Sequence, residues 1–144
     1  RQFTQFAIEA DKFVKQLAAD LGHAEDLDKS RRILKSVLHT LRDRMSIQES
    51  FQLMAQLPTL LKGLYVENWK YSERPLNYRS KQSLFEALKA AEHLTQTDDF
   101  PNQQYAVHAV NTVLKNLSQY VSAGEMADVL AQLPTEIRSL VNIK

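Results

Sequence analysis

Ala55-Gln56-Leu57-Pro58-Thr59 is a five-residue run that the chain repeats unchanged as Ala131-Gln132-Leu133-Pro134-Thr135. The two copies are 76 positions apart, and the same shift aligns 11 identical residues within the 28 positions from 37 to 64. Composition alone would give roughly two identities in such a window. The sequence therefore predicts a tandem duplication of one structural unit.

Upstream of position 37 the two copies match more weakly, and the shift between them falls to 71. This shift sets three apolar residues of the first half beside three of the second: Phe13, Val14 and Leu17 beside Leu84, Phe85 and Leu88. The smaller shift upstream predicts that the second half has a longer loop, around residues 95–101.

Apolar residues recur in both halves at the three- and four-residue spacing of an α-helix. The first stripe predicts a helix over about residues 4–21, with Phe6, Ala10, Phe13, Val14, Leu17 and Leu21. A second helix carries Ile33, Leu34, Val37, Leu38, Leu41 and Met45. Its counterpart in the second half carries Ala106, Ala109, Val110, Val113, Leu114, Leu117 and Val121.

A third and a fourth helix in each half are indicated by their boundaries. Ser46-x-x-Glu49 and Ser122-x-x-Glu125 fit a capping box, in which hydroxyl and carboxylate satisfy the free backbone donors of a helix start. Pro58 and Pro134 then end the third helix and begin a short fourth. The predicted fold class is all-α, a tandem duplication of a four-helix unit packed as one compact helical domain. Its parts are a first repeat (1–65), an aromatic-rich linker (66–79) and a second repeat (80–144).

Composition supports this fold class and removes several kinds of chemistry. The 144 residues suit one domain, and 3 Gly with 4 Pro disfavour a turn-rich β architecture. The absence of cysteine excludes disulfides, thiolate metal sites and cysteine nucleophiles, and it fits a cytoplasmic protein. No apolar run reaches the roughly 20 residues of a membrane span. The net charge of +1 gives no overall attraction to nucleic acid or anionic lipid.

Two motifs resemble the prokaryotic domain-of-unknown-function 2267 family (DUF2267): Ala55-Gln56-Leu57-Pro58-Thr59-Leu60-Leu61-Lys62-Gly63-Leu64-Tyr65 and Ser122-x-Gly124-Glu125-x-x-Asp128-Val129-x-Ala131-Gln132-Leu133-Pro134. Glu67-Asn68-Trp69 is similar to the family's aromatic stretch before its second half. The resemblance covers nearly the whole chain and implies an all-helical bacterial or archaeal protein. It implies no catalytic residue, cofactor or substrate. The segment from Lys70 to Pro75 departs from the family's linker.

No catalytic or metal-binding motif is present in the sequence. The four histidines, which lack H-E-x-x-H and H-x-x-x-H spacing, are His23, His39, His93 and His108. The chain has neither a G-x-S-x-G elbow nor a phosphate-binding glycine loop. Gly22 is interpreted as the stop of the first helix, Asp20-x-x-His23 as residues at that helix end, and Asp98-Asp99 before Pro101 as a helix N-cap. We therefore expect no catalytic residue, cofactor or metal.

The second helix carries the one concentration of charge above background. Arg31, Lys35, His39 and Arg42 fall within about 80° of one another at 100° per residue, which predicts an exposed cationic stripe. The aligned positions in the second copy are Val107, Asn111, Lys115 and Ser118, so the repeated fold does not require the charge. The stripe is either a solvated helix face or a surface for nucleic acid or another anionic partner.

The linker and its edge gather aromatic side chains: Tyr65, Trp69, Tyr71 and Tyr78. Such residues are enriched at protein interfaces because they combine a large apolar body with a polar tip. They either cover the seam between the halves or join a partner. We expect Trp69 to be substantially buried, with Tyr65 or Tyr71 packed beside it, because leaving it in water would forgo about 25 cal/mol per Å² of apolar burial.

The preferred functional prediction is a non-enzymatic interaction or scaffold domain with a protein partner or a second copy of itself. The alternative is a nucleic-acid or anionic-partner binder that uses the cationic stripe. A weaker alternative is a small-molecule site between the two halves.

Overall fold

The computed structural model describes residues 2–70, 77–92 and 97–142, and within these ranges it has eight helices and no strand. In chain order the helices are α1 (Gln2–Leu21), α2 (Leu27–Arg44), α3 (Ile47–Met54), α4 (Thr59–Val66), α5 (Lys81–Glu92), α6 (Gln103–Leu117), α7 (Ala123–Ala131) and α8 (Thr135–Arg138). The predicted all-α class is confirmed. None of these helices is both long and apolar enough to cross a membrane.

Helix α1 ends where the sequence predicts, at a glycine. Gly22 has a positive φ of 89°, a conformation that costs little without a side chain. The N–H of His23 donates to the carbonyl of Ala18 at 2.8 Å, and that of Gly22 donates to Ala19 at 3.1 Å. These two bonds form a Schellman-type end, which satisfies carbonyls that the helix leaves free.

Helices α3 and α7 begin with the same side-chain cap. Ser46 Oγ accepts from the N–H of Glu49 at 3.2 Å, and Ser122 Oγ accepts from the N–H of Glu125 at 3.1 Å. The hydroxyl half of each predicted capping box is therefore confirmed. The carboxylate half is wrong for Glu125, because the N–H of Ser122 donates to Gln56 Oε1 at 2.7 Å.

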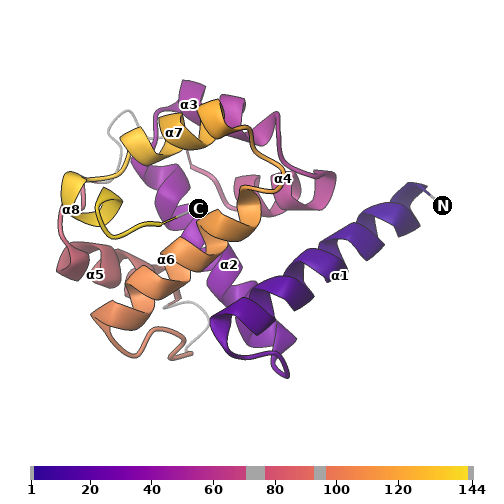
Figure 1. Ribbon diagram of the computed structural model, residues 1–144, viewed down its shortest axis with the longest axis horizontal. Coiled ribbons are helices and arrows are strands. Elements are labelled where there is room, and N and C mark those ends of the chain that lie inside the picture. Colours follow the sequence, from indigo (N-terminus) through magenta and orange to yellow (C-terminus); the bar gives the residue numbers. More distant parts are fainter. Residues whose placement is uncertain (1, 71–76, 93–96, 143–144) are drawn as a thin grey trace.

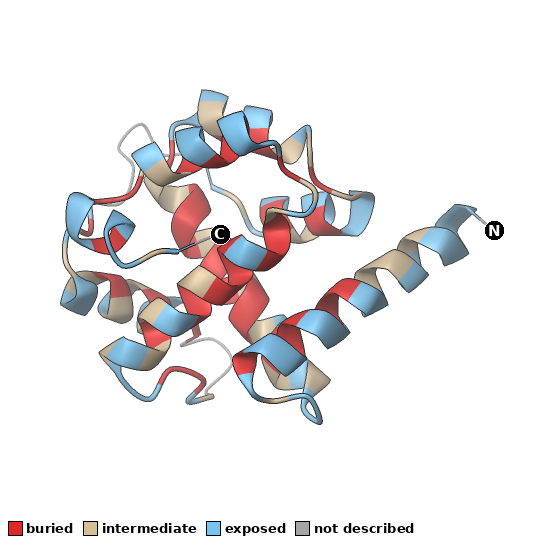
Figure 2. Ribbon diagram, in the orientation of Figure 1, coloured by how far each residue is buried: buried red, intermediate tan, exposed pale blue. Residues whose placement is uncertain are grey.

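The two longest central helices, α2 and α6, form the middle of the molecule (Figure 1), and their buried residues form a nearly continuous strip (Figure 2). Helix α1 packs on α6, and α5 packs on α2, so the first helix of each half lies on the second helix of the other. Helix α3 packs on α7. These crossed contacts tie the halves together.

One hydrophobic cluster contains buried residues from both halves. Its side chains that are fully buried or nearly so include Phe13, Leu17, Ile33, Leu34, Leu38, Leu84, Leu88, Phe100, Leu114 and Leu117. The N-terminal turns of α1 extend away from this core (Figure 1), and Phe3 there is 82% exposed.

Candidate functional site

Arg42 lies in the last turn of α2 and is only 4% exposed. Its Nη1 donates to the carbonyl oxygens of Tyr65 and Glu67, both at 2.8 Å, and its Nε donates to Asp43 Oδ1 at 2.8 Å. The carbonyls at a helix C-terminus lack partners within the helix and carry partial negative charge. Arg42 therefore caps the C-terminal end of α4 from inside the fold.

His39 and Lys35 bind the same end of α4. His39 Nε2 donates to the carbonyl oxygen of Leu64 at 2.8 Å, and Lys35 Nζ donates to Glu67 Oε1 at 2.8 Å. Burial lowers the pKa of His39, and the charges of Arg42 and Lys35 lower it further. The hydrogen bond from Lys35 lowers the pKa of Glu67. The side chains of Lys35 and Glu67 are 40% and 44% exposed, so this pair contributes little to stability.

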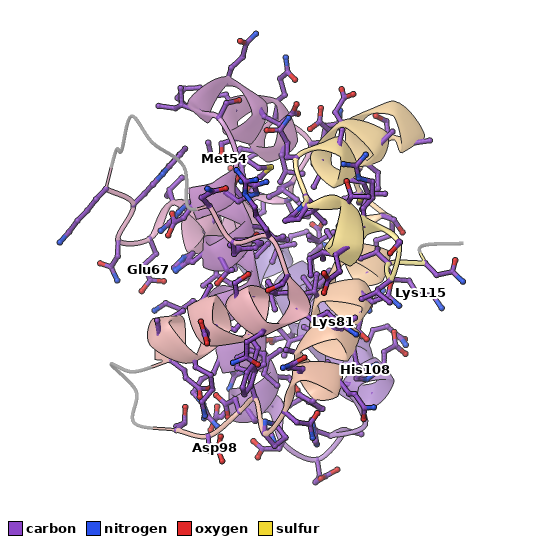
Figure 3. All side chains as sticks on the ribbon, turned by 90° about the vertical axis from the view of Figure 1, so that its left-hand side faces the viewer. Met54, Glu67, Lys81, Asp98, His108 and Lys115 are labelled. Atoms are coloured by element: carbon purple, nitrogen blue, oxygen red, sulfur yellow. The ribbon has the colours of Figure 1, made fainter. Side chains whose placement is uncertain are left out.

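The predicted cationic stripe is exposed only at its N-terminal end. Arg31 is exposed and pairs with Asp28, Lys35 and His39 are half-buried, and Arg42 is buried. The expectation that all four side chains face solvent is wrong for Arg42. Periodicity places the four residues on one face of α2, but it does not reveal that the end of α4 covers part of that face. Figure 3 shows Glu67, the partner of Lys35, and Lys115, the residue aligned with His39, on opposite sides of the molecule.

The aromatic residues near the linker pack against the C-terminal end of the stripe. Tyr65 is fully buried, its hydroxyl shares a 2.7 Å hydrogen bond with Ser50 Oγ, and burial raises its pKa. Trp69 packs partly buried against the core, with its ring edge-to-face on Tyr65 at 5.9 Å and tilted against Phe51 at 6.4 Å. The guanidinium of Arg42 lies 5.7 Å from the Trp69 ring centroid. The expected packing of Tyr65 beside Trp69 is confirmed.

The other two aromatic candidates lie apart from this contact. Tyr78 is buried, its hydroxyl donates to the carbonyl of Thr40 at 3.3 Å, and the guanidinium of Arg44 lies 5.6 Å from its ring centroid. Burial raises the pKa of Tyr78. Tyr71 lies outside the described residues. The C-terminal end of the stripe thus meets two of the aromatic residues, Tyr65 and Trp69, in one contact, although the sequence assigns them to separate candidate surfaces.

A groove in the second half was not predicted. It lies between the end of α6, one face of α7 and the segment after α8, and it encloses about 890 Å³ including its open mouth. Its floor is apolar and buried at Val121 and Met126, and Leu130 and Val141 line it further. No aromatic side chain lines it. The sequence does contain a signal for a hollow at this place, because three small residues of the second half align with much larger ones of the first. The small residues are Ser118, Ala127 and Val141, and their counterparts are Arg42, Phe51 and Tyr65.

Asp98 and Asp99, which precede α6, form ion pairs and do not cap the helix. Asn102 is the N-cap of α6, since its Oδ1 accepts from the N–H of Tyr105 at 2.8 Å. Asp99 is 2% exposed and accepts two 3.0 Å hydrogen bonds from Arg32 of α2, while Asp98 pairs with Lys89. The prediction of an Asp98-Asp99 N-cap is wrong because the N-cap of α6 lies three residues beyond Asp99, at Asn102, whose side chain caps equally well.

His23 and Asp20 join the two halves at the end of α1. His23 Nε2 lies 2.6 Å from the hydroxyl of Tyr105 on α6. Asp20 Oδ2 accepts from Asn116 Nδ2 of the same helix at 3.0 Å. Both side chains therefore take part in the α1–α6 contact, which agrees with their interpretation as residues of a helix end.

The eight helices of the described residues and their shared core define an all-helical protein, and its candidate site is the open groove beside α7. The comparison with family models is more specific. The model described as "Uncharacterized conserved protein (DUF2267)" matches residues 10–140, and the chain belongs to this family. The resemblance noted in the sequence is thereby confirmed. A search of curated proteins finds no match to the chain.

Proposed function

We propose that this protein is a non-enzymatic helical interaction domain that binds a segment of a partner protein. The observation that carries the proposal is the open groove lined by Val121, Met126, Leu130 and Val141. Apolar hollows of this size are typical of sites where another molecule binds. The groove is distinct from the core, because its mouth opens to solvent past the exposed wall residue Ala127.

The proposal takes the chain to be a tandem duplication, with repeats at 1–65 and 80–144 joined by the linker 66–79. The 76-residue sequence repeat supports this reading. So do the matching starts of α3 and α7 at Ser46 and Ser122, and of α4 and α8 after Pro58 and Pro134. Under this reading the groove corresponds to the region of the first half that holds Trp69.

The first half indicates what kind of occupant the groove accepts. There, the chain's own Trp69 lies between α3 and the end of α4, against Phe51 and Tyr65. The aligned wall residues of the second half are smaller, and the groove between them is open. We therefore infer that the occupant is a peptide segment of a partner protein that inserts an aromatic side chain.

A second copy of this chain is the less favoured partner. Trp69, its one tryptophan, already packs on Tyr65 and Arg42 within its own fold. Releasing it to fill a neighbour's groove would expose Tyr65, which is fully buried. A partner with its own aromatic segment avoids this cost.

The test uses a synthetic peptide of residues 62–70, the segment that carries Trp69 in the first half. We expect the labelled peptide to bind the purified protein saturably in fluorescence anisotropy. Ala127→Glu should weaken binding at least about tenfold, or about 1.4 kcal/mol, because it places a carboxylate on the groove wall. Ala127 is exposed, so this variant should retain the fold.

The matched control is Ala19→Glu, which adds the same charge at an exposed position of α1. This variant should bind the peptide as the wild type does. Peptide that does not bind, or that binds Ala127→Glu as tightly as the wild type, would refute the groove as the interaction site. A dimer in analytical ultracentrifugation that is lost in Ala127→Glu would favour a second copy over a foreign partner.

The two alternative functions have weaker support. The stripe on α2 retains only Arg31 and Lys35 near solvent, and both pair with carboxylates, so an anionic partner would have to displace these pairs. Binding to nucleic acid would also weaken steeply with added salt, whereas binding in an apolar groove would not. Between the halves, the hollow lined by Phe6, Phe13, Leu61 and Tyr120 encloses about 230 Å³, below the usual size of a small-molecule site. A second hollow, between α1 and the segment after α6, encloses about 590 Å³ including its open mouth, but polar side chains make up much of its lining: Glu9, Lys12, Gln16 and Gln119.

A further inference from the structure

Three carboxylates converge where α3 packs on α7, two helices that lie side by side (Figure 1). Glu49 comes from α3, and Glu125 and Asp128 come from α7. One oxygen of each carboxylate lies within 4.8 Å of the other two. The cluster is outside both the Arg42 contact and the groove, because none of its members lines either.

The local sequence explains why these carboxylates are available. In a complete capping box, the glutamate would accept the N–H of the serine three residues before it. Here Ser122 donates that N–H to Gln56 of the other half, at 2.7 Å. The carboxylate of Glu125 is therefore released from its own helix start and lies near Glu49.

The repeat explains why two glutamates meet. Glu49 and Glu125 are aligned by the 76-residue shift. When two equivalent helices pack through equivalent faces, each residue near the axis meets its own counterpart. A glutamate in one copy of the repeated motif thus faces the same glutamate in the other copy. Two like charges are brought together although they are 76 residues apart in the sequence.

Burial makes this arrangement costly for the protein alone. Glu125 is more than nine-tenths buried, with 7% of its surface exposed. One oxygen of Glu125 and one of Glu49 are enclosed, and neither accepts a hydrogen bond from the described part of the chain. Burial, followed by the neighbouring Glu49, raises the pKa of Glu125 to about 7. An enclosed carboxylate without a donor requires either a proton or a cation.

We propose that Glu49, Glu125 and Asp128 bind a hard divalent cation, at a site that the ligand spacing in the sequence does not predict. All three ligands offer oxygen, which Ca²⁺, Mg²⁺ and Mn²⁺ prefer over softer ions. The exposed Asp128 leaves the site open to solvent, so water can complete the coordination.

The cation would link α3 to α7, and thereby the first half to the second. A site of this kind, open on one side and fixed by two short helices, is expected to have a Kd of about 10⁻⁴ to 10⁻³ M, as in calcium-binding extracellular modules.

The test is isothermal titration calorimetry of chelator-treated protein with CaCl₂. We expect one saturable site per chain. Glu125→Gln and Glu49→Gln should each weaken binding by more than about 100-fold. Loss of a residue that only hydrogen-bonds to a metal ligand weakens binding by about 10- to 100-fold, and loss of a ligand itself should cost more. Glu25→Gln, at an exposed acidic residue outside the cluster, is the control and should bind as the wild type does.

Folding of the variants is checked by thermal unfolding in chelator. Glutamine has the shape of glutamate without its charge, so both variants should unfold at or above the temperature of the wild type. No saturable heat up to about 10 mM CaCl₂, well above the expected Kd, would overturn the site. Binding that persists in Glu125→Gln would overturn the assignment of its ligands.

Discussion

At the end of α4, the first half is closed by its own chain: Arg42 donates to two carbonyls, and Trp69 packs on Tyr65. At the aligned place in the second half, Ser118 and Val141 border an open apolar groove. The same order of helices thus carries a sealed end and an open end. The difference is accounted for by the larger side chains of the first half and by the buried charge of Arg42.

The comparison teaches that the two ends serve different purposes. In the first half, cations of α2 are used to hold the C-terminus of α4, which is a structural role. In the second half, α8 has only 4 residues and the corresponding position of α6 is a serine whose hydroxyl donates to the carbonyl of Lys115 in its own helix. The groove of the second half thus lies where the first half has these internal contacts.

The largest effect is expected for Arg42→Ala compared with Ser118→Ala. Arg42→Ala removes two charged hydrogen bonds to carbonyls of α4 and should lower the free energy of unfolding by about 2–4 kcal/mol. Ser118→Ala, at the aligned position, should change it by less than about 0.5 kcal/mol. Urea denaturation followed by circular dichroism measures both. Equal effects of the two substitutions would remove the asymmetry on which the comparison rests.

A somewhat smaller effect is expected for Trp69→Ala. Full truncation of a buried tryptophan costs about 3–5 kcal/mol, and Trp69 is only partly buried, so we expect about 2 kcal/mol. Leu60→Ala, at a side chain that is 46% exposed, is the control and should have a minor effect. Unfolding of the monomer by urea is the measurement. If Trp69→Ala abolished self-association and left monomer stability unchanged, Trp69 would be an interface residue and the sealed end would be misassigned.

Much of this fold could be predicted from sequence, because helices depend on local signals. The spacing of apolar residues located α1, α2 and α6, and Ser46 and Ser122 located the starts of α3 and α7. Gly22 located the end of α1, because the positive φ at a helix end is a local feature that favours glycine. Such signals act over three or four residues, which is the range in which a single sequence is informative.

The features that the sequence did not predict depend on contacts between residues far apart in the chain. Periodicity placed Arg42 on the same face as Arg31, but only the position of α4 decides that Arg42 is buried and Arg31 is not. Asp99 fits an N-cap by its local sequence, yet it pairs with Arg32, 67 residues away. The approach of Glu49 to Glu125 likewise depends on how α3 packs on α7.

The smallest effect concerns pH at the sealed end. Because burial lowers the pKa of His39 in the folded state, the unfolded chain binds a proton more readily near pH 6.5. The contribution of His39 to stability is therefore present above pH 6.5 and is lost as the pH falls below it. Compared with His39→Gln, the wild type should lose stability between pH 7.5 and pH 5, a window chosen to span about one unit or more on each side of the usual histidine pKa.

Urea denaturation of both proteins across this window gives the difference directly, and other titrating groups cancel because the two chains share them. Lys115, aligned with His39, provides the comparison with the open end: Lys115→Gln should show no such dependence. Parallel pH profiles for wild type and His39→Gln would show that His39 titrates normally, contrary to its burial at the end of α4.

The central claim is that the second half holds an open binding groove where the first half is sealed. Titrating ¹⁵N-labelled protein with the peptide of residues 62–70 and recording amide chemical shifts tests it most directly. The account predicts saturable shifts at residues 118–131 and 141–142, which surround the groove, with α2 and α4 unchanged. Shifts confined to α2 and α4, or none at saturating peptide, would contradict it.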